Sequence, residues 1–129
     1  MPDSGTNVLL IDDDAVAREF YSFILEDEGF TVRACESVPE AIIELEQRLP
    51  EILITDLAMP RMSGFDLIKY VKSKPRFAEL PVIAITADGD GYRKLALGLG
   101  VSWFLVKPFS NEILFDAIKD SLSKKRITG

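Results

Sequence analysis

Five short apolar runs, separated by segments with helical periodicity, restrict the fold of this chain more than any other feature of its sequence. They cover residues 7–11, 31–35, 51–55, 81–86 and 102–106. Three of them are nearly continuous aliphatic stretches, which are typical of parallel strands covered by helices on both faces. The run at 31–35 alternates apolar and polar residues, which favours an edge strand. Strand and helix alternate five times, which predicts an α/β domain with a parallel sheet, right-handed crossovers and helices on both faces.

The segments between the runs have the spacing and end signals of helices. We expect helices within residues 14–29, 37–50, 63–75, 90–100 and 110–125. The expected N-terminal caps are Ser37, Ser63 and Ser110. Ser37 is expected to form a capping box with Glu40. The expected stop signals are Gly29, Pro50 and Pro75. In the fourth segment Gly91 and Gly98 each cost about 1 kcal/mol relative to alanine, so its helix is expected to be short or mobile. The residues expected to face the sheet are Ala17, Phe20, Ile24 and Leu25; Ala41, Ile42, Leu45 and Leu49; and Ile113, Leu114, Ala117, Ile118 and Leu122.

One domain accounts for the sequence. Its 129 residues, 47% of them hydrophobic, are enough for one core, and no linker or repeat interrupts the alternation. We place the domain at residues 7–125, between an N-terminal extension at 1–6 and a C-terminal tail at 126–129. The formal net charge of −6 argues against direct nucleic-acid binding, which needs a basic surface. The basic stretch at 124–126 is expected to be a solvated helix end.

Cysteine and histidine usage narrows the chemistry. The single cysteine, Cys35, excludes an intramolecular disulfide and a cysteine-based metal site, and a reduced, cytoplasmic setting is expected. Residues 1–7 are polar and are not expected to act as a signal peptide, and no apolar run reaches the roughly 18 residues of a membrane span. The chain contains no histidine, so any histidine chemistry has to come from a partner.

Polar side chains able to perform chemistry stand at the ends of four expected strands. They are Asp12, Asp13 and Asp14 after the first strand, Asp56 after the third, Thr86 at the end of the fourth and Lys107 after the fifth. In a parallel sheet these ends share one edge, and ligands bind outside the carboxyl ends of the strands. We therefore expect these side chains to converge. Asp14 has an equally good second interpretation, as the cap of the helix that follows it.

Such a convergence would have a specific chemical use. Clustered carboxylates repel one another, and a hard divalent cation removes this penalty. Mg²⁺ prefers oxygen ligands, and Asp12, Asp13 and Asp56 supply enough of them for a site that also keeps several waters. Lys107 can pair with Asp56 or with a phosphate on it, and Thr86 can donate to a phosphoryl oxygen. Together these groups predict phosphoryl transfer to a carboxylate.

In this combination and order, the sequence resembles the receiver domain of two-component response regulators. The resemblance covers about residues 6–125 and is carried by "LLIDDDAVARE", "ILITDLAMPRMSGFDLI", "VIAITA" and "FLVKPF". It implies the flavodoxin-like, doubly wound (βα)5 fold of that family, with a five-stranded parallel sheet in the strand order 2-1-3-4-5 and helices on both faces.

The resemblance also implies a role for each motif residue. Asp56 corresponds to the phosphoacceptor, and Asp12 and Asp13 correspond to the acidic pair that holds Mg²⁺ (or Mn²⁺) together with it. Asp13 is expected to bind the metal directly and Asp12 partly through water. The backbone carbonyl of Ala58 is the expected third protein ligand, and Lys107 corresponds to the lysine that contacts the phosphoryl group.

A switch and a loop are implied in the same way. Thr86 corresponds to the hydroxyl residue that moves toward the phosphoryl group, and Phe104 to the aromatic residue that fills the space it leaves. Pro108 is expected to follow Lys107 through a cis peptide bond. Gly64 belongs to the loop after Asp56 and is expected to supply a backbone conformation that other residues resist.

The implied function is a signalling switch and not an enzyme acting on an external substrate. A sensor histidine kinase or a histidine-containing phosphotransfer protein donates the phosphoryl group to Asp56, and the domain catalyses this transfer and later hydrolyses the acyl phosphate. The modification then biases the surface of the fourth helix, fifth strand and fifth helix, which acts on a downstream protein or on an output domain outside this sequence. We expect no membrane contact and a monomer before phosphorylation, with a phosphorylation-dependent dimer as the alternative. A stand-alone regulator and a domain of a larger protein both fit.

Several positions depart from the common family pattern. Val101 and Ser102 stand where many members have Ala and Asp. Trp103 beside the switch aromatic is unusual, and it is either a half-buried packing residue or part of a partner surface. Ala58 and Asp88 occupy positions that tune the access of water to the acyl phosphate, so we expect a finite phosphoryl lifetime.

Two other functions fit part of the pattern. Asp12 and Asp14 after the first strand resemble the nucleophile and acid/base pair of haloacid-dehalogenase-like phosphatases. That interpretation leaves Asp56 without a role and lacks an acidic pair after a later strand. The second alternative is a receiver fold that serves only as an interaction module and is never phosphorylated. Replacing Asp56 by Asn tests the first alternative, and incubation with magnesium and acetyl phosphate tests the second.

Overall fold

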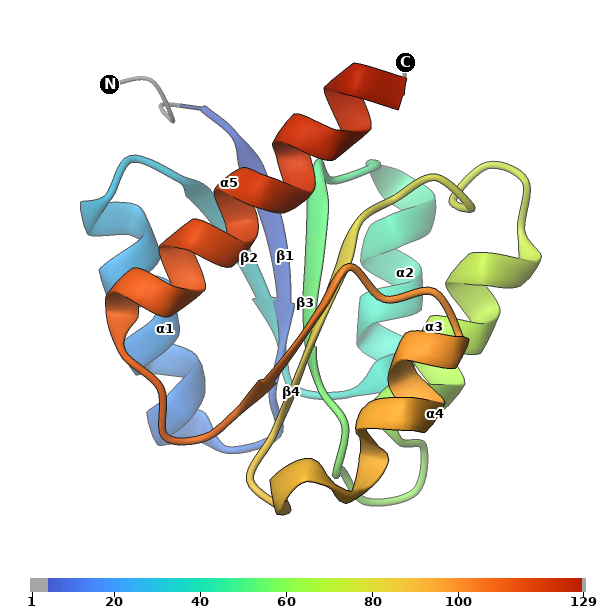
Figure 1. Ribbon diagram of the computed structural model, residues 1–129, viewed down its shortest axis with the longest axis horizontal. Coiled ribbons are helices and arrows are strands. Elements are labelled where there is room, and N and C mark those ends of the chain that lie inside the picture. Colours follow the sequence, from blue (N-terminus) through green and yellow to red (C-terminus); the bar gives the residue numbers. More distant parts are fainter. Residues whose placement is uncertain (1–4, 129) are drawn as a thin grey trace.

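A five-stranded parallel sheet forms the middle layer of the molecule (Figure 1). The computed structural model describes the backbone of residues 5–128 and the side chains of residues 5–89 and 91–123. The strands are β1 (Asn7–Ile11), β2 (Thr31–Cys35), β3 (Ile52–Asp56), β4 (Val82–Thr86) and β5 (Trp103–Val106). They pair in the order β2-β1-β3-β4-β5, with every neighbouring pair parallel. The predicted fold class and strand order are confirmed, and β2 is an edge strand.

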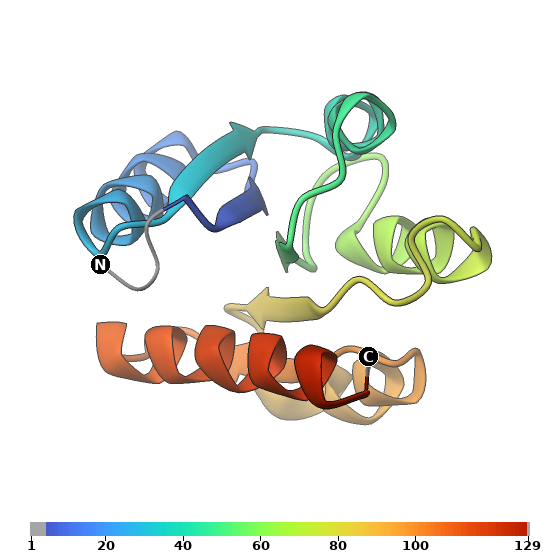
Figure 2. The same cartoon turned by 90° about the horizontal axis from the view of Figure 1, so that it is seen from above.

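Helices cover the sheet on both faces. They are α1 (Ala15–Asp27), α2 (Val38–Gln47), α3 (Gly64–Ser73), the 3₁₀ turn η1 (Gly89–Tyr92), α4 (Arg93–Gly98) and α5 (Asn111–Thr128). Figure 2, which views the molecule from above, shows α1 and α5 on one side of the sheet and α2 and α3 on the other. The fourth helix is short, as its glycines predicted, with six residues after the 3₁₀ turn.

Alternate strand residues contribute to two separate cores. Leu9, Ile11 and Leu53 belong to the core that includes buried residues of α2, α3 and α4. Val8 and Ile54 belong to the core under α1 and α5. All five residues of β3 and all five of β4 are buried, which explains why the central strands read as continuous apolar runs.

The helix caps follow the predictions with one correction. The Ser37 hydroxyl accepts a hydrogen bond from the Glu40 backbone N–H at 3.3 Å. The Glu40 carboxylate accepts from the backbone N–H of Glu36, not of Ser37, so the reciprocal capping box predicted at α2 is wrong in its second half. A complete box is present at α3, between Ser63 and Asp66. The predicted cap of α5 at Ser110 and the stop of α1 at Gly29, which has a φ of 106°, are both present.

Three residues predicted to face the sheet are instead exposed. The exposed fractions of Phe20, Leu49 and Ile113 are 51%, 45% and 48%. On α1 the inward position next to Phe20 is taken by Tyr21, which is 9% exposed. Leu49 lies beyond the end of α2, which stops at Gln47, before the predicted stop at Pro50. Ile113 stands in the first turn of α5, one residue before the inward-facing Leu114.

At the C-terminal end of the chain, the last helix extends beyond the predicted domain boundary. The helix α5 runs to Thr128, and the boundaries placed at residues 6 and 125 stay predictions. Residues 1–4 and the side chains of the basic stretch at 124–126 lie outside the described residues. No helix in the described part of the chain combines the length and the apolar character needed to cross a membrane. The expected cis peptide bond joins Lys107 and Pro108.

Candidate functional site

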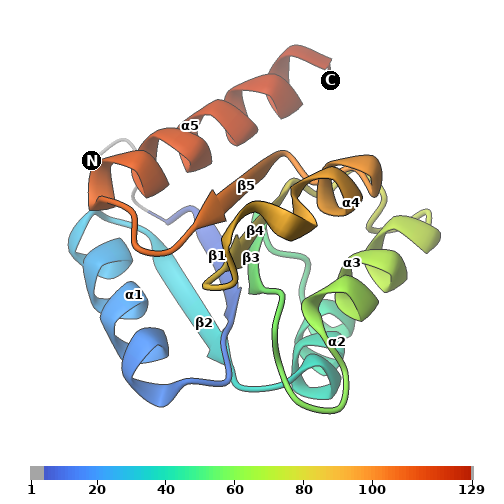
Figure 3. The same ribbon diagram turned by 60° about the horizontal axis from the view of Figure 1, so that its bottom comes forward.

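The carboxyl ends of the strands meet at one edge of the sheet, the lower edge in Figure 1, which comes forward in Figure 3. The register brings the strand-end residues to the same level. Ile11 of β1 pairs with Thr55 of β3, so Asp12 and Asp56 follow side by side. Asp56 pairs with Ile85 of β4, and Thr86 pairs with Val106, the residue before Lys107. The structure therefore brings the predicted strand-end residues to one edge, although they are up to 95 positions apart in sequence.

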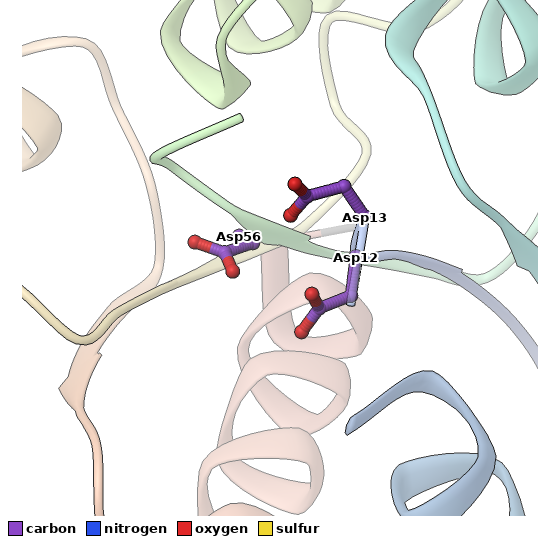
Figure 4. Close-up of side chains that lie close together, drawn as sticks. All are labelled: Asp12, Asp13 and Asp56. Carbon is purple, nitrogen blue, oxygen red and sulfur yellow. The ribbon is translucent and has the colours of Figure 1, made fainter. Parts of the chain in front are cut away.

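Three carboxylates form the centre of this edge. Asp12, Asp13 and Asp56 each offer an oxygen that lies within 4.8 Å of the other two, and Figure 4 shows the three side chains converging. Asp12 and Asp56 are buried, with exposed fractions of 2% and 8%, whereas Asp13 is exposed. The cluster thus has two carboxylates set into the protein and a third facing solvent.

One cation reaches into the cluster. The Lys107 ammonium lies 3.2 Å from Asp12 Oδ2 and 3.3 Å from Asp56 Oδ2, and it donates to both. Its backbone is fixed to the end of β4, because the Lys107 N–H donates to the Thr86 carbonyl at 2.8 Å. One ammonium shared between two buried carboxylates leaves this part of the site with an excess of negative charge.

The pKa values of Asp56 and Lys107 are both raised from their ordinary values, which shows how the charges of the site are balanced. Burial raises the pKa of Asp56, and the negative charge of Asp12 raises it further, while the Lys107 ammonium and the Ala58 N–H act in the opposite direction. Burial alone would lower the pKa of Lys107, but Asp56 and Asp12 together outweigh it and raise that pKa. The lysine is therefore firmly protonated, whereas the negative charge of Asp56 is held at a cost.

Backbone groups fix the direction of the two buried carboxylates. Asp56 Oδ1 accepts a hydrogen bond from the Ala58 N–H at 3.1 Å, and Asp12 Oδ1 accepts one from the Asp14 N–H at 3.0 Å. The Asp14 side chain caps α1 by accepting from the Val16 N–H at 3.1 Å. Of the two interpretations of Asp14, the structure supports the helix cap.

The donor set suits a hard divalent cation. Three carboxylate oxygens within reach of one another, against a single ammonium, provide oxygen ligands and uncompensated charge, which Mg²⁺ prefers. Asp13 also lines an open hollow of about 400 Å³ with Ser37, Met59 and Arg61 among its other residues, so the cluster is accessible from solvent. A metal ligand role for the Ala58 carbonyl stays a prediction.

The two expected switch residues lie close to this edge but are occupied by other contacts. Thr86 is fully buried, and its hydroxyl accepts a hydrogen bond from the Asp88 N–H at 3.0 Å. The described contacts include no hydrogen bond from this hydroxyl to Asp56. Phe104 is 3% exposed, and the Arg93 guanidinium of α4 lies over its ring at 4.9 Å from the centroid.

The loop after Asp56 requires glycine for a reason other than the predicted one. The expected unusual backbone conformation of Gly64 is absent, since its φ is not in the positive range; in this loop the positive φ occurs at Arg61, at 67°. A Cβ added to Gly64 would instead lie 2.1 Å from the Asp56 carbonyl oxygen and 2.9 Å from Leu57 Cα. Gly64 therefore allows the start of α3 to pack directly against the backbone of Asp56.

Sequence reasoning did not identify several residues that contact the site or its surroundings. Arg18 donates to the Asp12 carbonyl at 2.8 Å, and the Tyr21 ring lies under the Lys107 ammonium. Trp103, which the sequence already marks as unusual, is half-exposed, and its indole joins β5 to α5 by donating to Asp120 Oδ2 at 2.8 Å. The sequence predicted Phe20 and not Tyr21 on the inward face of α1, although Tyr21 also stands at helical spacing from Ala17.

Comparisons with known proteins agree with this arrangement. The family model "Response regulator receiver domain" matches residues 8–119. An uncharacterized 14.6 kDa protein in the sodA1 3′ region of Leptolyngbya boryana is 42% identical over 103 residues, which are 79% of each chain. The phosphate regulon transcriptional regulatory protein PhoB of Rhizobium meliloti is 32% identical over 92% of this chain and 53% of its own length. This chain therefore spans about half the length of that regulator.

A solved structure shares the fold over nearly its whole length. The crystal structure of a response regulator receiver domain protein from Clostridium thermocellum superimposes with a TM-score of 0.89 and 28% identity, covering 96% of this chain and 99% of that one.

Proposed function

The chain belongs to the response regulator receiver domain family, and we propose that its Asp56 accepts a phosphoryl group from a phosphohistidine on a partner protein in a Mg²⁺-dependent reaction. The observation that carries this proposal is the position of the Asp56 carboxylate. It is buried, lies within 4.8 Å of two further carboxylates and is contacted by an ammonium at 3.3 Å. A nucleophile with a cation beside it and a metal-binding group around it is what phosphoryl transfer requires.

The proposed reaction changes two bonds. An Asp56 carboxylate oxygen attacks the phosphorus of the donor, the phosphorus–nitrogen bond breaks, and the histidine imidazole leaves with the bonding electron pair. In the later hydrolysis, a water oxygen attacks the same phosphorus, and the bond to Asp56 breaks to release inorganic phosphate and the carboxylate. Lys107 stays beside the reacting carboxylate and neutralises charge on the phosphoryl oxygens. Because these 129 residues include no histidine, the proposed phosphohistidine lies outside this sequence.

Mg²⁺ would be held by Asp12, Asp13 and Asp56, with the Ala58 carbonyl as a further proposed ligand. When bound, the ion supplies positive charge that neutralises the carboxylates and the phosphoryl oxygens. The three acidic side chains fit this role because their oxygens lie within 4.8 Å of one another.

Thr86 and Phe104 are the proposed switch. The Thr86 hydroxyl is bonded to the Asp88 N–H, and the new phosphoryl oxygens offer it a more strongly charged acceptor. Phe104, in the neighbouring strand β5, shares a core with Ala96 of α4 and lies under the Arg93 guanidinium. Movement of the Thr86 side chain would change the packing of Phe104 and so bias the surface of α4, β5 and α5. This surface would act on a downstream protein or on an output domain.

A protein donor is supported by the exposed side of α1. Val16, Phe20 and Phe23 share one face of this helix and are 75%, 51% and 69% exposed. The helix begins at Ala15, next to the acidic cluster. A partner protein that covers this apolar stripe would therefore bring its phosphohistidine close to Asp56. We propose a sensor histidine kinase or a phosphotransfer protein as this partner, in the cytoplasm where such donors present their phosphohistidine.

The test uses a small phosphoryl donor. Acetyl phosphate with Mg²⁺ is expected to add one phosphoryl mass to the intact chain, and EDTA or Asp56→Asn is expected to prevent the addition. A chain that gains no mass with acetyl phosphate or with any kinase would instead be an interaction module. Stable modification that persists in Asp56→Asn would place the acceptor elsewhere.

The phosphatase alternative loses its main support in the structure. It requires Asp14 to act as an acid/base group, but the Asp14 side chain is used as the cap of α1. It also leaves Asp56 without a role, although this residue is buried among the charged groups of the site.

A further inference from the structure

We propose that Tyr21 is a positioning residue for Lys107, and that the face of its ring holds the lysine ammonium against Asp12 and Asp56. The Lys107 Nζ lies over the Tyr21 ring, 5.8 Å from its centroid. This distance is within the range in which an ammonium is attracted by the negative face of an aromatic ring. The inference rests on the proposed function, because it assigns a part in phosphoryl transfer to a residue outside the charged cluster.

The Tyr21 ring is itself firmly placed. It is 9% exposed, stacks on the Phe109 ring with 5.9 Å between centroids and 11° between planes, and meets the Phe20 ring edge-on at 5.7 Å. Phe109 follows Lys107 by two residues, so the stack joins α1 to the segment that carries the ammonium. The stack of Tyr21 on Phe109 therefore restrains the position of the Tyr21 ring relative to the segment that contains Lys107.

Lys107 needs such a restraint because its side chain is long and its other partners change during the reaction. A lysine side chain loses roughly 2 kcal/mol of rotamer entropy when held in one position. In the described structure the ammonium is held by Asp12 and Asp56, at 3.2 and 3.3 Å. A metal ion and a phosphoryl group would both alter those carboxylates. The Tyr21 ring is altered by neither, so its attraction for the ammonium persists through the reaction.

A purely structural role for Tyr21 makes a different prediction. If the residue only fills space under α1, leucine should replace it as well as phenylalanine does. If the ring face holds the ammonium, phenylalanine should be sufficient and leucine should not, because only the aromatic residue has a negative face.

The experiment measures the initial rate of phosphorylation by acetyl phosphate at saturating Mg²⁺ for Tyr21→Phe and Tyr21→Leu. Tyr21→Phe should remain within about twofold of the unmodified chain. Phosphorylation of Tyr21→Leu should be slower by about two- to fivefold, which corresponds to a loss of about 0.5–1 kcal/mol of attraction for the ammonium. In a Lys107→Met background, the phosphorylation rates of Tyr21→Phe and Tyr21→Leu should differ by less than about twofold, because the ammonium that the ring would hold is absent.

A control separates positioning from loss of packing. Ile24 is buried on the same helix, in the same core, and no contact of it with the Lys107 ammonium is described. Ile24→Ala should lower the free energy of unfolding, as measured by urea unfolding. In the absence of urea, at a temperature where this variant is folded, its rate of phosphorylation should be unchanged.

The inference is overturned if Tyr21→Leu is phosphorylated as fast as the chain without substitutions, or if Tyr21→Phe and Tyr21→Leu are equally slow. It is also overturned if Tyr21→Leu causes the same loss of rate in the Lys107→Met background. An unmodified chain that accepts no phosphoryl group overturns the proposed function and this inference with it. A phosphorylated chain in which Tyr21→Leu has no effect overturns the inference alone.

Discussion

Replacing Asp56 by asparagine should remove phosphoryl acceptance and, at the same time, stabilise the metal-free fold. The Asp56 carboxylate is 8% exposed and belongs to a cluster of three carboxylates that has one ammonium. Asparagine keeps the shape of the side chain and an oxygen that can accept from the Ala58 N–H, but it removes the charge. The proposed phosphoacceptor is therefore expected to be a place where function is maintained at the expense of stability.

The charges at known distances indicate which effect dominates. Because their carboxylate oxygens lie at most 4.8 Å apart, Asp12 repels Asp56 by at least about 3.5 kcal/mol at an effective dielectric constant of about 20. The exposed Asp13 is better screened and contributes roughly half of that. Lys107 at 3.3 Å attracts Asp56 by about 5 kcal/mol on the same scale. These charge interactions nearly cancel. The remaining effect is the cost of burying a carboxylate, which is several kcal/mol and is smaller for a neutral amide. We expect Asp56→Asn to raise the free energy of unfolding by about 1–3 kcal/mol.

The pH dependence of this difference has a definite sign. The pKa of Asp56 is raised in the folded chain above the ordinary value of 3.8, so the folded state binds its proton more tightly than the unfolded state. Stability from this group is therefore complete below about pH 3.8 and is lost as the pH rises through the folded pKa. The advantage of asparagine should be small near pH 4 and largest at neutral pH.

Urea unfolding in EDTA, followed by the fluorescence of the single tryptophan, measures this difference at several pH values. The exposed Asp116→Asn is the matched control and should change stability by less than about 0.5 kcal/mol. Adding Mg²⁺ at tenfold its dissociation constant should then stabilise the unmodified chain by about 1.4 kcal/mol and Asp56→Asn by less. The reasoning is refuted if Asp56→Asn is no more stable than the unmodified chain at neutral pH, or if its advantage does not shrink on acidification.

Three further substitutions test other parts of the structure. Lys107→Met removes the ammonium beside the proposed phosphoacceptor and should slow phosphorylation by acetyl phosphate about hundredfold in an intact-mass time course; a rate within threefold would contradict its role. Gly64→Ala should lower the free energy of unfolding by about 2 kcal/mol or more, because its Cβ would lie 2.1 Å from a carbonyl oxygen, whereas Gly98→Ala, which meets nothing within 4 Å, should not destabilise the chain. Phe23→Ser should reduce transfer from any histidine kinase that phosphorylates the unmodified chain while leaving acetyl phosphate unaffected, and equal effects on both donors would exclude the α1 surface.

The sheet and its reactive edge were predictable because each depends on a local pattern. Continuous aliphatic runs indicate buried parallel strands, and the residue after each run then has to lie at the same edge. This reasoning alone places Asp12, Asp56, Thr86 and Lys107 at that edge. The strand order itself came from the family resemblance, since periodicity does not say which strands are neighbours.

The helix faces were less predictable because apolar residues occur on both sides of α1. Phe20 and Phe23 are exposed while Tyr21 and Ile24 are buried, and all four are compatible with helical spacing. Hydrophobicity alone therefore could not determine the rotation of the helix on the sheet. The role of Gly64 was missed for a related reason, because the close approach of α3 to the Asp56 carbonyl is a tertiary contact that leaves no local signal.

The charge of the site connects its chemistry to its proposed switching. Three carboxylates and one ammonium leave a net charge of about −2, which a divalent cation neutralises. Converting Asp56 to an acyl phosphate replaces one negative charge by about two, so the loaded site again has a negative excess. Further hydrogen-bond donors are then attracted to it. The Thr86 hydroxyl stands at the end of the neighbouring strand, where its oxygen accepts from the Asp88 N–H; among the described contacts its own proton has no acceptor, and a phosphoryl oxygen would provide one. The same charge imbalance that suits the cluster to a divalent cation thus supplies the force proposed to move the switch residue.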